Sequence, residues 1–209
     1  MSRPKTPLDE GATSEAVGTQ ERILASAHDI VSAKGFNGSG LNEILQRAGV
    51  PKGSFYHYFA SKEALGVALI ERARDEHLEH MGPLLSDRGM TPLQRLRAVF
   101  DSGFEECRDS GTSCECLIAK LALETSNLSD SVHAAVKGAY QQWSTGLAGV
   151  LKEGQAAGEI AARHDADHLA NVLVMLWIGA TTRMQIERSL QPLEDFLDFV
   201  FGTLLPHSP

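Results

Sequence analysis

Apolar residues recur three or four positions apart along almost the whole chain, which is the spacing of one face of an α-helix. The sequence contains neither strand-like alternation of useful length nor a hairpin turn. The pattern therefore predicts an all-α fold. The expected helices run from 19 to 34, from 41 to 48, from 51 onward, from 62 to about 80 and from 92 onward, and then over 114–125, 129–157, 165–188 and 192–205.

Residues that favour helix ends mark several of these boundaries. Gly49 follows the short helix at 41–48, as glycine commonly does at a helix C-terminus. Thr91 and Gln94 have the spacing of a capping box, with Pro92 at the first helical position, where a missing N–H costs nothing. These signals predict short connections between helices.

A change in composition divides the chain near residues 82–90, where glycine and proline flank a polar turn. The part before this turn is too small to be secure alone and should lean on the rest. We expect a flexible N-terminal tail at 1–18, a small helical domain at 19–80 and a larger helical domain at 81–209.

Charge and composition limit the classes of function. The formal net charge of −8 over 209 residues argues against a chain coated in basic residues, so any contact with an anionic partner must be local. The longest apolar run, at 169–180, is shorter than the roughly 18 residues that a membrane helix needs. The polar N-terminus lacks a signal-peptide pattern. We therefore expect a cytoplasmic protein that is not in a membrane.

Residues 41–59 have the form of a helix-turn-helix, two short helices joined by a tight turn at Gly49. In that motif the second helix enters the major groove of DNA. Lys52, Gly53 and Ser54 open this second helix, where backbone N–H groups favour a phosphate oxygen. The stretch from 47 to 62 contains no acidic residue, so this window is positive in an acidic protein.

The aromatic residues of the second helix divide between two faces. Phe55 and Phe59 lie four residues apart and are expected in the small core. Tyr56 and His57 lie off that stripe and can present polar tips to a ligand surface, whereas Tyr58 is ambiguous. The alternative is that all four aromatic residues are simply core.

The segment GFNGSGLNEILQRAGVPKGSFYHYFASKEALGVALI at 35–70 closely resembles the DNA-binding region of the TetR/AcrR family of transcriptional repressors. The resemblance implies an all-α homodimer that reads a palindromic double-stranded DNA operator and binds a small-molecule inducer. We expect no cofactor and no metal. Gly40 departs from the Thr or Ser that usually caps the first motif helix and touches a phosphate, and Ser39 is the candidate replacement. The DNA contacts that the resemblance implies are Lys52, Gly53, Ser54, Tyr56, His57 and Lys62.

The last two predicted helices are the most apolar of the chain. Their apolar residues need a larger partner surface than one small domain offers, and the resemblance implies a four-helix dimer interface. The alternative is ordinary core within one chain. The expected interface residues are Leu169, Val172, Leu173, Leu176, Ala180, Phe196, Phe199 and Val200.

The three cysteines, Cys107, Cys114 and Cys116, lie within ten residues of one another. Their spacing, without a nearby histidine, does not fit a zinc site. An odd number of cysteines also argues against a disulfide framework. A catalytic cysteine–histidine pair has equally little support, since no orienting motif accompanies the histidines.

A narrower resemblance concerns the stretch GTSCECLIAKLALE at 111–124, which looks like the repressors that respond to reactive electrophiles and small unsaturated acids. In that subgroup a Cys-Leu pair opens the sixth helix, which matches Cys116 and Leu117. A helix N-terminus would lower the pKa of the Cys116 thiol, while Glu115 opposes this shift. The alternative is a small buried cysteine. Cys107 and Cys114 would be resolving or incidental thiols.

A reversible inducer in an apolar pocket is the competing account of regulation. Its walls would be the aromatic residues Phe104, Tyr140, Trp143 and Trp177. Two further alternatives are a small helical enzyme and a helical dimerisation module with a vestigial helix-turn-helix. The absence of a paired acid–base, metal or cofactor motif outside the N-terminal domain argues against the enzyme.

Overall fold

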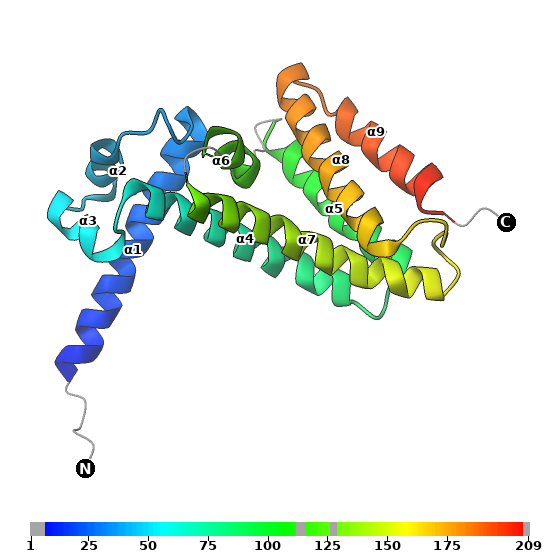
Figure 1. Cartoon of the computed structure of the whole chain (residues 1–209), viewed down its shortest axis with the longest axis horizontal. Coiled ribbons are helices and arrows are strands. Elements are labelled where there is room, and N and C mark those ends of the chain that lie inside the picture. Colours follow the sequence, from blue (N-terminus) through cyan, green and yellow to red (C-terminus); the bar gives the residue numbers. More distant parts are fainter. Residues whose placement is uncertain (1–6, 112–115, 126–128, 207–209) are drawn as a thin grey trace, which may run out of the picture.

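The computed structural model describes residues 7–111, 116–125 and 129–206, with side chains from residue 18 onward. Its described part confirms the all-α prediction (Figure 1). One isolated antiparallel bridge joins Ile160 and Pro206. The helices are α1 (Pro7–Lys34), α2 (Leu41–Ala48), α3 (Lys52–Tyr58), α4 (Lys62–Ser86), α5 (Pro92–Asp109), α6 (Leu117–Thr125), α7 (Asp130–Ala156), α8 (Ala166–Glu187), α9 (Gln191–Phe199) and the π-helical turn η1 (Val200–Leu204).

The small N-terminal domain gathers α1, α2, α3 and the start of α4 at one end of the molecule (Figure 1). Gly49 ends α2 in the left-handed conformation at φ 65°, which glycine adopts at no steric cost. The N–H of Val50 donates to the carbonyl of Leu45 at 3.0 Å, so the chain turns sharply into α3. The buried apolar residues of this domain are Ile23, Leu24, Ala27, Ile30, Val31, Phe36, Ile44, Leu45, Ala48, Val50, Phe55, Phe59, Leu65, Leu69 and Ile70.

Helix α4 belongs to both domains and runs across the expected division at residue 80. The helix begins after Ser61, whose hydroxyl accepts the N–H of Ala64 at 3.1 Å, and continues to Ser86. Pro83 lies near its end, where the missing N–H removes one helical hydrogen bond without stopping the helix. Met81 is buried and holds this part of α4 in the larger domain. The two domains therefore share a helix and one continuous core.

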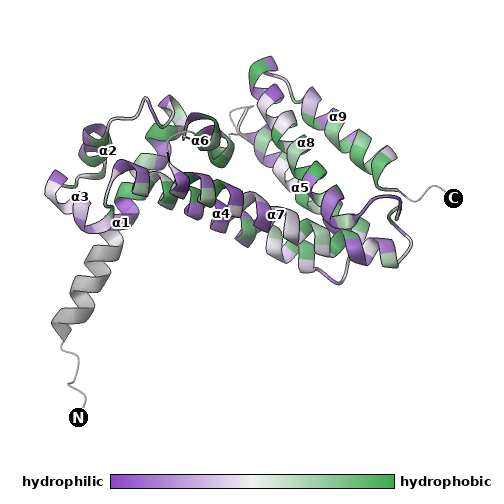
Figure 2. Ribbon diagram, viewed as in Figure 1, coloured by the Kyte–Doolittle hydropathy of each residue, from purple (hydrophilic) through white to green (hydrophobic). Residues whose placement is uncertain are grey.

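The larger domain packs α4, α5 and α8 around α7, with α9 against α8. Helix α5 opens with the predicted capping box. The hydroxyl of Thr91 accepts the N–H of Gln94 at 3.4 Å, and the Gln94 amide oxygen accepts the N–H of Thr91 at 2.9 Å. Figure 2 shows hydrophobic residues along both α8 and α9.

Two helix starts differ from the sequence-based expectation. Helix α1 begins at Pro7, so it includes residues 7–18 of the stretch expected as a flexible tail; residues 1–6 lie outside the described part. Proline suits a first helical turn and no proline follows within α1, so the helix continues without a break. Helix α6 begins at Leu117 rather than at 114, and residues 112–115 are not described.

Helix α8 is long and apolar enough to cross a membrane by length and composition, with a mean hydropathy of 1.2 in its best window. The helix packs against α7 and α9. Its side chains at Leu169, Ala170, Leu173 and Val174 lie in the core of the chain. The core helix of a soluble protein passes the same hydropathy test. The hydropathy of α8 is therefore only weak evidence that it spans a membrane.

Candidate nucleic-acid interface and ligand cavity

Helix α3 has the two faces that its sequence predicts. Phe55 is 0% exposed and Phe59 is 4% exposed, and their ring centroids lie 5.5 Å apart in the core. Tyr56, between them in sequence, is 57% exposed, and His57 is also exposed. Tyr58 is half-buried and packs against the core. The assignment of core and surface faces on α3 is therefore confirmed.

The exposed start of α3 carries the residues expected to meet DNA. Lys52 and Gly53 are exposed and Ser54 is half-buried. No ion pair joins Lys52 to another residue of the described part. A Cβ added to Gly53 would have no atom within 4 Å, so packing does not require glycine there. Gly40 is exposed at the start of α2 and has no side chain to cap that helix.

Two of the expected DNA contacts point into the protein instead. Ser39 is 2% exposed and its hydroxyl donates to the carbonyl of Phe36 at 2.7 Å. The ammonium of Lys62 donates to the same carbonyl at 2.5 Å and lies 4.5 Å from the centroid of the Phe36 ring. Burial lowers the pKa of Lys62. The side chains of Ser39 and Lys62 thus hold the loop before α2, and a phosphate contact by either residue stays an untested prediction.

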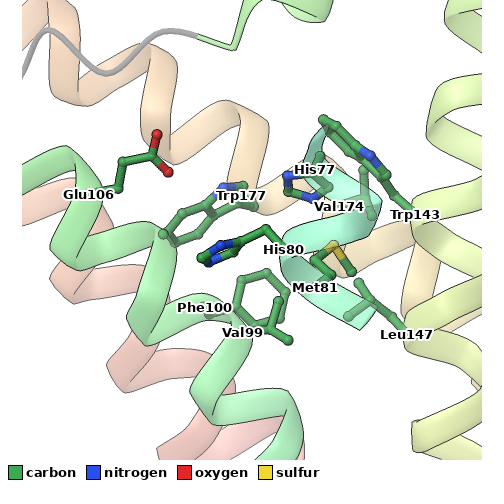
Figure 3. Close-up of a pocket in the computed structure, with 11 residues that line it drawn as sticks. His77, His80, Met81, Val99, Phe100, Glu106, Trp143, Leu147, Val174 and Trp177 are labelled. Carbon is green, nitrogen blue, oxygen red and sulfur yellow. The ribbon is translucent and has the colours of Figure 1, made fainter. Parts of the chain in front are cut away.

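A cavity opens in the larger domain among α4, α5, α7 and α8 (Figure 3). Its empty volume is about 520 Å³, open solvent included. A neighbouring hollow shares six of its lining residues and reaches Cys116. A Cβ added to Gly103 would lie 2.8 Å from the Trp177 ring, so glycine at this position makes room for the indole. The residues that line the first cavity are His77, His80, Met81, Val99, Phe100, Gly103, Glu106, Trp143, Leu147, Val174 and Trp177.

The structure brings two of the four predicted wall residues to this cavity. Trp143 and Trp177 line it, whereas Phe104 and Tyr140 do not. Phe104 is half-buried against the core, and Tyr140 borders a separate shallow hollow on α7. Helical spacing alone did not separate these positions, because residues three apart on α7 fall on one side of the helix yet meet different neighbours.

The polar groups of the cavity centre on His77 and Trp143. Their ring centroids lie 4.1 Å apart. Burial, with a smaller effect of His80, lowers the pKa of His77 to about 4, so its imidazole is neutral at pH 7. Trp143 is 6% exposed, and its buried Nε1–H has no hydrogen-bond partner among the described residues. A buried donor of this kind costs free energy until an acceptor reaches it.

Cys116 lies just before α6 at the edge of the neighbouring hollow, with its thiol free. Its Sγ accepts the N–H of Ala119 at 3.4 Å, which favours the thiolate. Burial outweighs this effect and raises the pKa of the Cys116 thiol, which favours the alternative of a buried cysteine over a lowered pKa. Burial and the negative charge of a Cys116 thiolate also raise the pKa of Tyr140.

Cys107 differs from the expectation of a resolving or incidental thiol. Cys107 is buried, at 1% exposure, and is disulfide-bonded. Cys114 lies outside the described residues. Groups of three or more histidine, cysteine or acidic side chains that could hold a metal ion do not occur among the described residues.

Helix α6 connects the cavity to the DNA-binding domain. Cys116 precedes its first turn, and its last turn carries Glu124. The Glu124 carboxylate accepts the backbone N–H of Asn37 at 2.8 Å, and its carbonyl accepts the Asn37 side-chain amide at 3.3 Å. The ammonium of Lys120 donates to the carbonyl of Ser32. A Cβ at Gly35 would collide with the Glu124 carboxylate, so glycine leaves room for this contact.

The outer face of α8 and α9 carries exposed apolar side chains. Leu176 is 39% exposed and Phe199 is 51% exposed, as expected of interface residues. The predicted interface residues that are instead buried within their own chain are Leu169, Leu173, Ala180, Phe196 and Val200, of which Ala180 and Phe196 also border the hollow described next. Val172 is half-buried. A shallow hollow between the two helices is lined by Met175, Leu176, Gly179, Ala180, Arg183, Pro192, Asp195, Phe196 and Phe199.

Several residues of these sites escaped the sequence analysis. His77 and His80 lie three apart on α4, and this spacing on one helix face could have indicated a shared site. The contact between Glu124 and Asn37 joins residues 87 positions apart. Local pattern carries no information about such a pairing.

An N-terminal helix-turn-helix joined to a helical domain with a cavity defines the class of helix-turn-helix regulators with a ligand-binding domain. Residues 23–69 match the family model of the bacterial regulatory proteins of the TetR family. Residues 92–200 match the model of the tetracyclin repressor-like C-terminal domain. The chain belongs to the TetR family.

Similar proteins cover nearly the whole chain. It is 35% identical over 182 residues to the transcriptional repressor NemR of Escherichia coli K12, covering 87% of this chain and 92% of that one. It is 34% identical over 187 residues to the repressor DhaR of Mycobacterium sp. GP1, covering 90% and 92%. A crystal structure of reduced E. coli NemR superposes with a TM-score of 0.84 at 33% identity, covering 91% of this chain and 98% of that one.

Proposed function

We propose that this protein is a transcriptional repressor that binds a palindromic DNA operator as a dimer and leaves it when a small molecule occupies the cavity of the larger domain. The observation that carries the proposal is the pairing of an exposed polar face on α3 with a cavity joined to that domain by α6. The relatives NemR and DhaR are named as repressors rather than enzymes. A DNA-bound repressor of this kind works in the cytoplasm.

The DNA contacts that we retain are on the exposed side of the helix-turn-helix. Lys52 supplies a cation without an ion-pair partner in the described part of the chain, and Tyr56 and His57 supply polar tips. Gly40 and Gly53 allow a close approach of the backbone to phosphates. Ser54 is half-buried and can offer its hydroxyl at the edge of the same surface.

We expect purified protein to select a palindromic duplex from a random or genomic DNA pool. Operator affinity should fall steeply with salt, by roughly 10³-fold between about 50 and 200 mM if six or more phosphates are neutralised. Gel shifts with the selected duplex at several salt concentrations provide the measurement. Lys52→Ala should weaken binding and flatten the salt slope, while failure to shift any selected duplex at low salt would refute the proposal.

The dimer that we propose forms through the outer face of α8 and α9. Met175 is 62% exposed beside Leu176 and Phe199, and such apolar area on a surface favours a partner. A second copy of the chain would bury this face around a two-fold axis. A two-fold dimer presents its α3 helices at multiples of one helical turn along the duplex, which explains the expected palindrome.

Two accounts of the inducer follow from the cavity. In the first, an electrophile or oxidant reacts with Cys116 and adds bulk at the start of α6. In the second, a reversible ligand fills the cavity among Trp143, Trp177 and their neighbours, and Cys116 only borders the adjoining hollow. The existence of a reduced form of the relative NemR supports the first account. The raised pKa of Cys116 makes its thiol a slower nucleophile at neutral pH.

Helix α6 would pass the state of the cavity to the DNA-binding domain through Glu124. N-ethylmaleimide, an electrophile that alkylates thiols, serves as the probe of Cys116. We expect Glu124→Ala to keep operator binding. The variant should reduce the effect of the reagent on operator affinity by about 5-fold or more, within the usual range of coupling free energies. The ratio of operator dissociation constants with and without the reagent measures this coupling.

Leu123→Ala is the matched control for Glu124→Ala. Leu123 neighbours Glu124 on α6 and is 83% exposed, so its removal should leave the ratio unchanged. If Glu124→Ala responded to the reagent as fully as the parent protein, signal transfer through this contact would be wrong.

A further inference from the structure

The charge around the cavity is one-sided. Glu76 and Glu106 are among the residues that line the cavity and its neighbouring hollow, and the described lining includes no lysine or arginine. Glu76 pairs with Arg72 at 2.7 Å, and Arg72 itself does not line the hollow. No ion pair involves Glu106 within the described part. Figure 3 shows Glu106 to one side of the ring cluster. A bound anion would therefore meet a carboxylate without meeting a fixed cation.

His77 does not supply the missing positive charge, and the other lining histidines, His80 and His28, already contact Ser102 and Asp29. His77 is packed against the Trp143 ring at 4.1 Å between centroids, and burial keeps its imidazole neutral. His80 is hydrogen-bonded to the hydroxyl of Ser102 at 2.6 Å. A carboxylate that entered this site would lose its hydration without a charged partner, which is costly. The lining thus disfavours acids.

One group of the lining favours the binding of an uncharged hydrogen-bond acceptor. The Nε1–H of Trp143 is buried and has no partner in the described chain, although its indole lines the cavity. An indole nitrogen is a donor only, so the group that satisfies it must be an acceptor. A carbonyl oxygen is such an acceptor, and the apolar walls formed by Phe100, Val99 and Leu147 suit the remainder of the molecule.

We propose that this cavity selects uncharged molecules that carry a carbonyl oxygen, which accepts the Trp143 Nε1–H, and rejects carboxylates of the same shape. The inference rests on the proposed ligand-binding role of the cavity and adds the chemical class of its ligand. It holds for both accounts of the inducer, because recognition by Trp143 requires no reaction at Cys116.

The test compares methyl cyclohexanecarboxylate with cyclohexanecarboxylate at pH 7.5. These probes share a ring and an acyl group and differ in charge. The chain has only two tryptophans, Trp143 and Trp177, and both line the cavity, so tryptophan fluorescence reports binding directly. We expect the ester to bind the parent protein at least about 10-fold more tightly than the acid, because desolvating the carboxylate costs more than 1.4 kcal/mol.

Three variants separate the causes of this preference. Trp143→Phe keeps the ring and removes the donor, and should weaken ester binding about 5-fold, the value of one hydrogen bond. Trp177→Phe removes the other indole and should preserve the preference for the ester. Glu106→Gln removes one negative charge and should tighten binding of the acid. The difference in affinity between the ester and the acid should therefore become smaller. Thermal melts of each variant check that the fold is intact.

The outcomes distinguish this inference from the proposed function. Ester binding that is unaffected by Trp143→Phe, equal affinity for the two probes, or no binding of the ester by the parent protein would each overturn it. Operator release is measured separately in gel shifts with the ester present. If the ester binds with the expected preference but DNA is not released, ligand recognition by Trp143 stands and the inducer mechanism fails.

Discussion

Replacing Phe55 by alanine is expected to destabilise the DNA-binding domain by about 3 to 5 kcal/mol, the usual cost of removing a fully buried phenylalanine. Phe55 is 0% exposed and its ring contacts those of Tyr56 and Phe59 at centroid distances of 5.2 and 5.5 Å. The domain is small, so this loss is a large part of its stability. Denaturant unfolding followed by circular dichroism measures the change.

Tyr56 provides the matched comparison for Phe55, because it neighbours Phe55 in sequence yet is 57% exposed. Tyr56→Phe and Lys52→Ala should leave the free energy of unfolding within about 0.5 kcal/mol of the parent protein, as is usual for surface changes. Both should weaken operator binding in gel shifts. The opposite result, an unaffected Phe55→Ala variant and an unfolded Tyr56→Phe variant, would reverse the assigned faces of α3.

N-ethylmaleimide is expected to release the parent protein from its operator and to leave the Cys116→Ser variant bound. The operator affinities of the two treated proteins should differ by about 10-fold or more, within the range of allosteric coupling. The adduct adds bulk where Cys116 meets the hollow beside the cavity and the first turn of α6. That helix contacts the DNA-binding domain through Lys120 and Glu124. Gel shifts during titration with the reagent provide the measurement.

The pH dependence of this reaction gives a second measure of the role of Cys116. Burial raises the pKa of its thiol, and only the thiolate reacts. Labelling of Cys116 should therefore accelerate up to about tenfold per pH unit as pH rises, as long as the pH stays below that pKa. Mass spectrometry of the modified peptide follows the rate.

A variant with Cys107 and Cys114 both replaced by serine is the control for Cys116→Ser and should retain release. Cys107 is disulfide-bonded and offers no free thiol to the reagent. If Cys116→Ser were released as readily as the parent protein, the covalent account would fail. A reversible inducer in the cavity would then be the better explanation of regulation.

Sequence reasoning succeeded where a feature depends on residues close together in the chain. The stripe formed by Phe55 and Phe59, the turn at Gly49 and the capping box at Thr91 follow from local spacing and local hydrogen bonds, and the structure has all three. Helical periodicity also predicted the number and order of the main elements. Boundaries were less certain, because α4 runs on past its predicted end to Ser86.

The same reasoning failed where a side chain could either contact its own chain or face a partner. Lys62 and Ser39 carry polar groups that suit a phosphate, but the carbonyl of Phe36 lies within reach of both. Leu173 and Leu176 are both apolar and lie on one helix, yet the first is buried in the chain and the second is exposed. The distinction depends on how α8 is rotated against α7 and α9, which no local pattern records.

The sequence by itself determined that the chain folds into helices, that a helix-turn-helix occupies its N-terminal part and that the chain resembles TetR-type repressors, because these depend on periodicity, turn chemistry and a local motif. Only the tertiary structure decided the rest. It placed the Trp143 indole, with its unpartnered N–H, beside His77. It also placed Cys116 at the edge of the neighbouring hollow, where burial raises the pKa of the thiol although a helix N-terminus should lower that pKa. Burial and long-range contact set these properties, and both arise only when distant helices pack together.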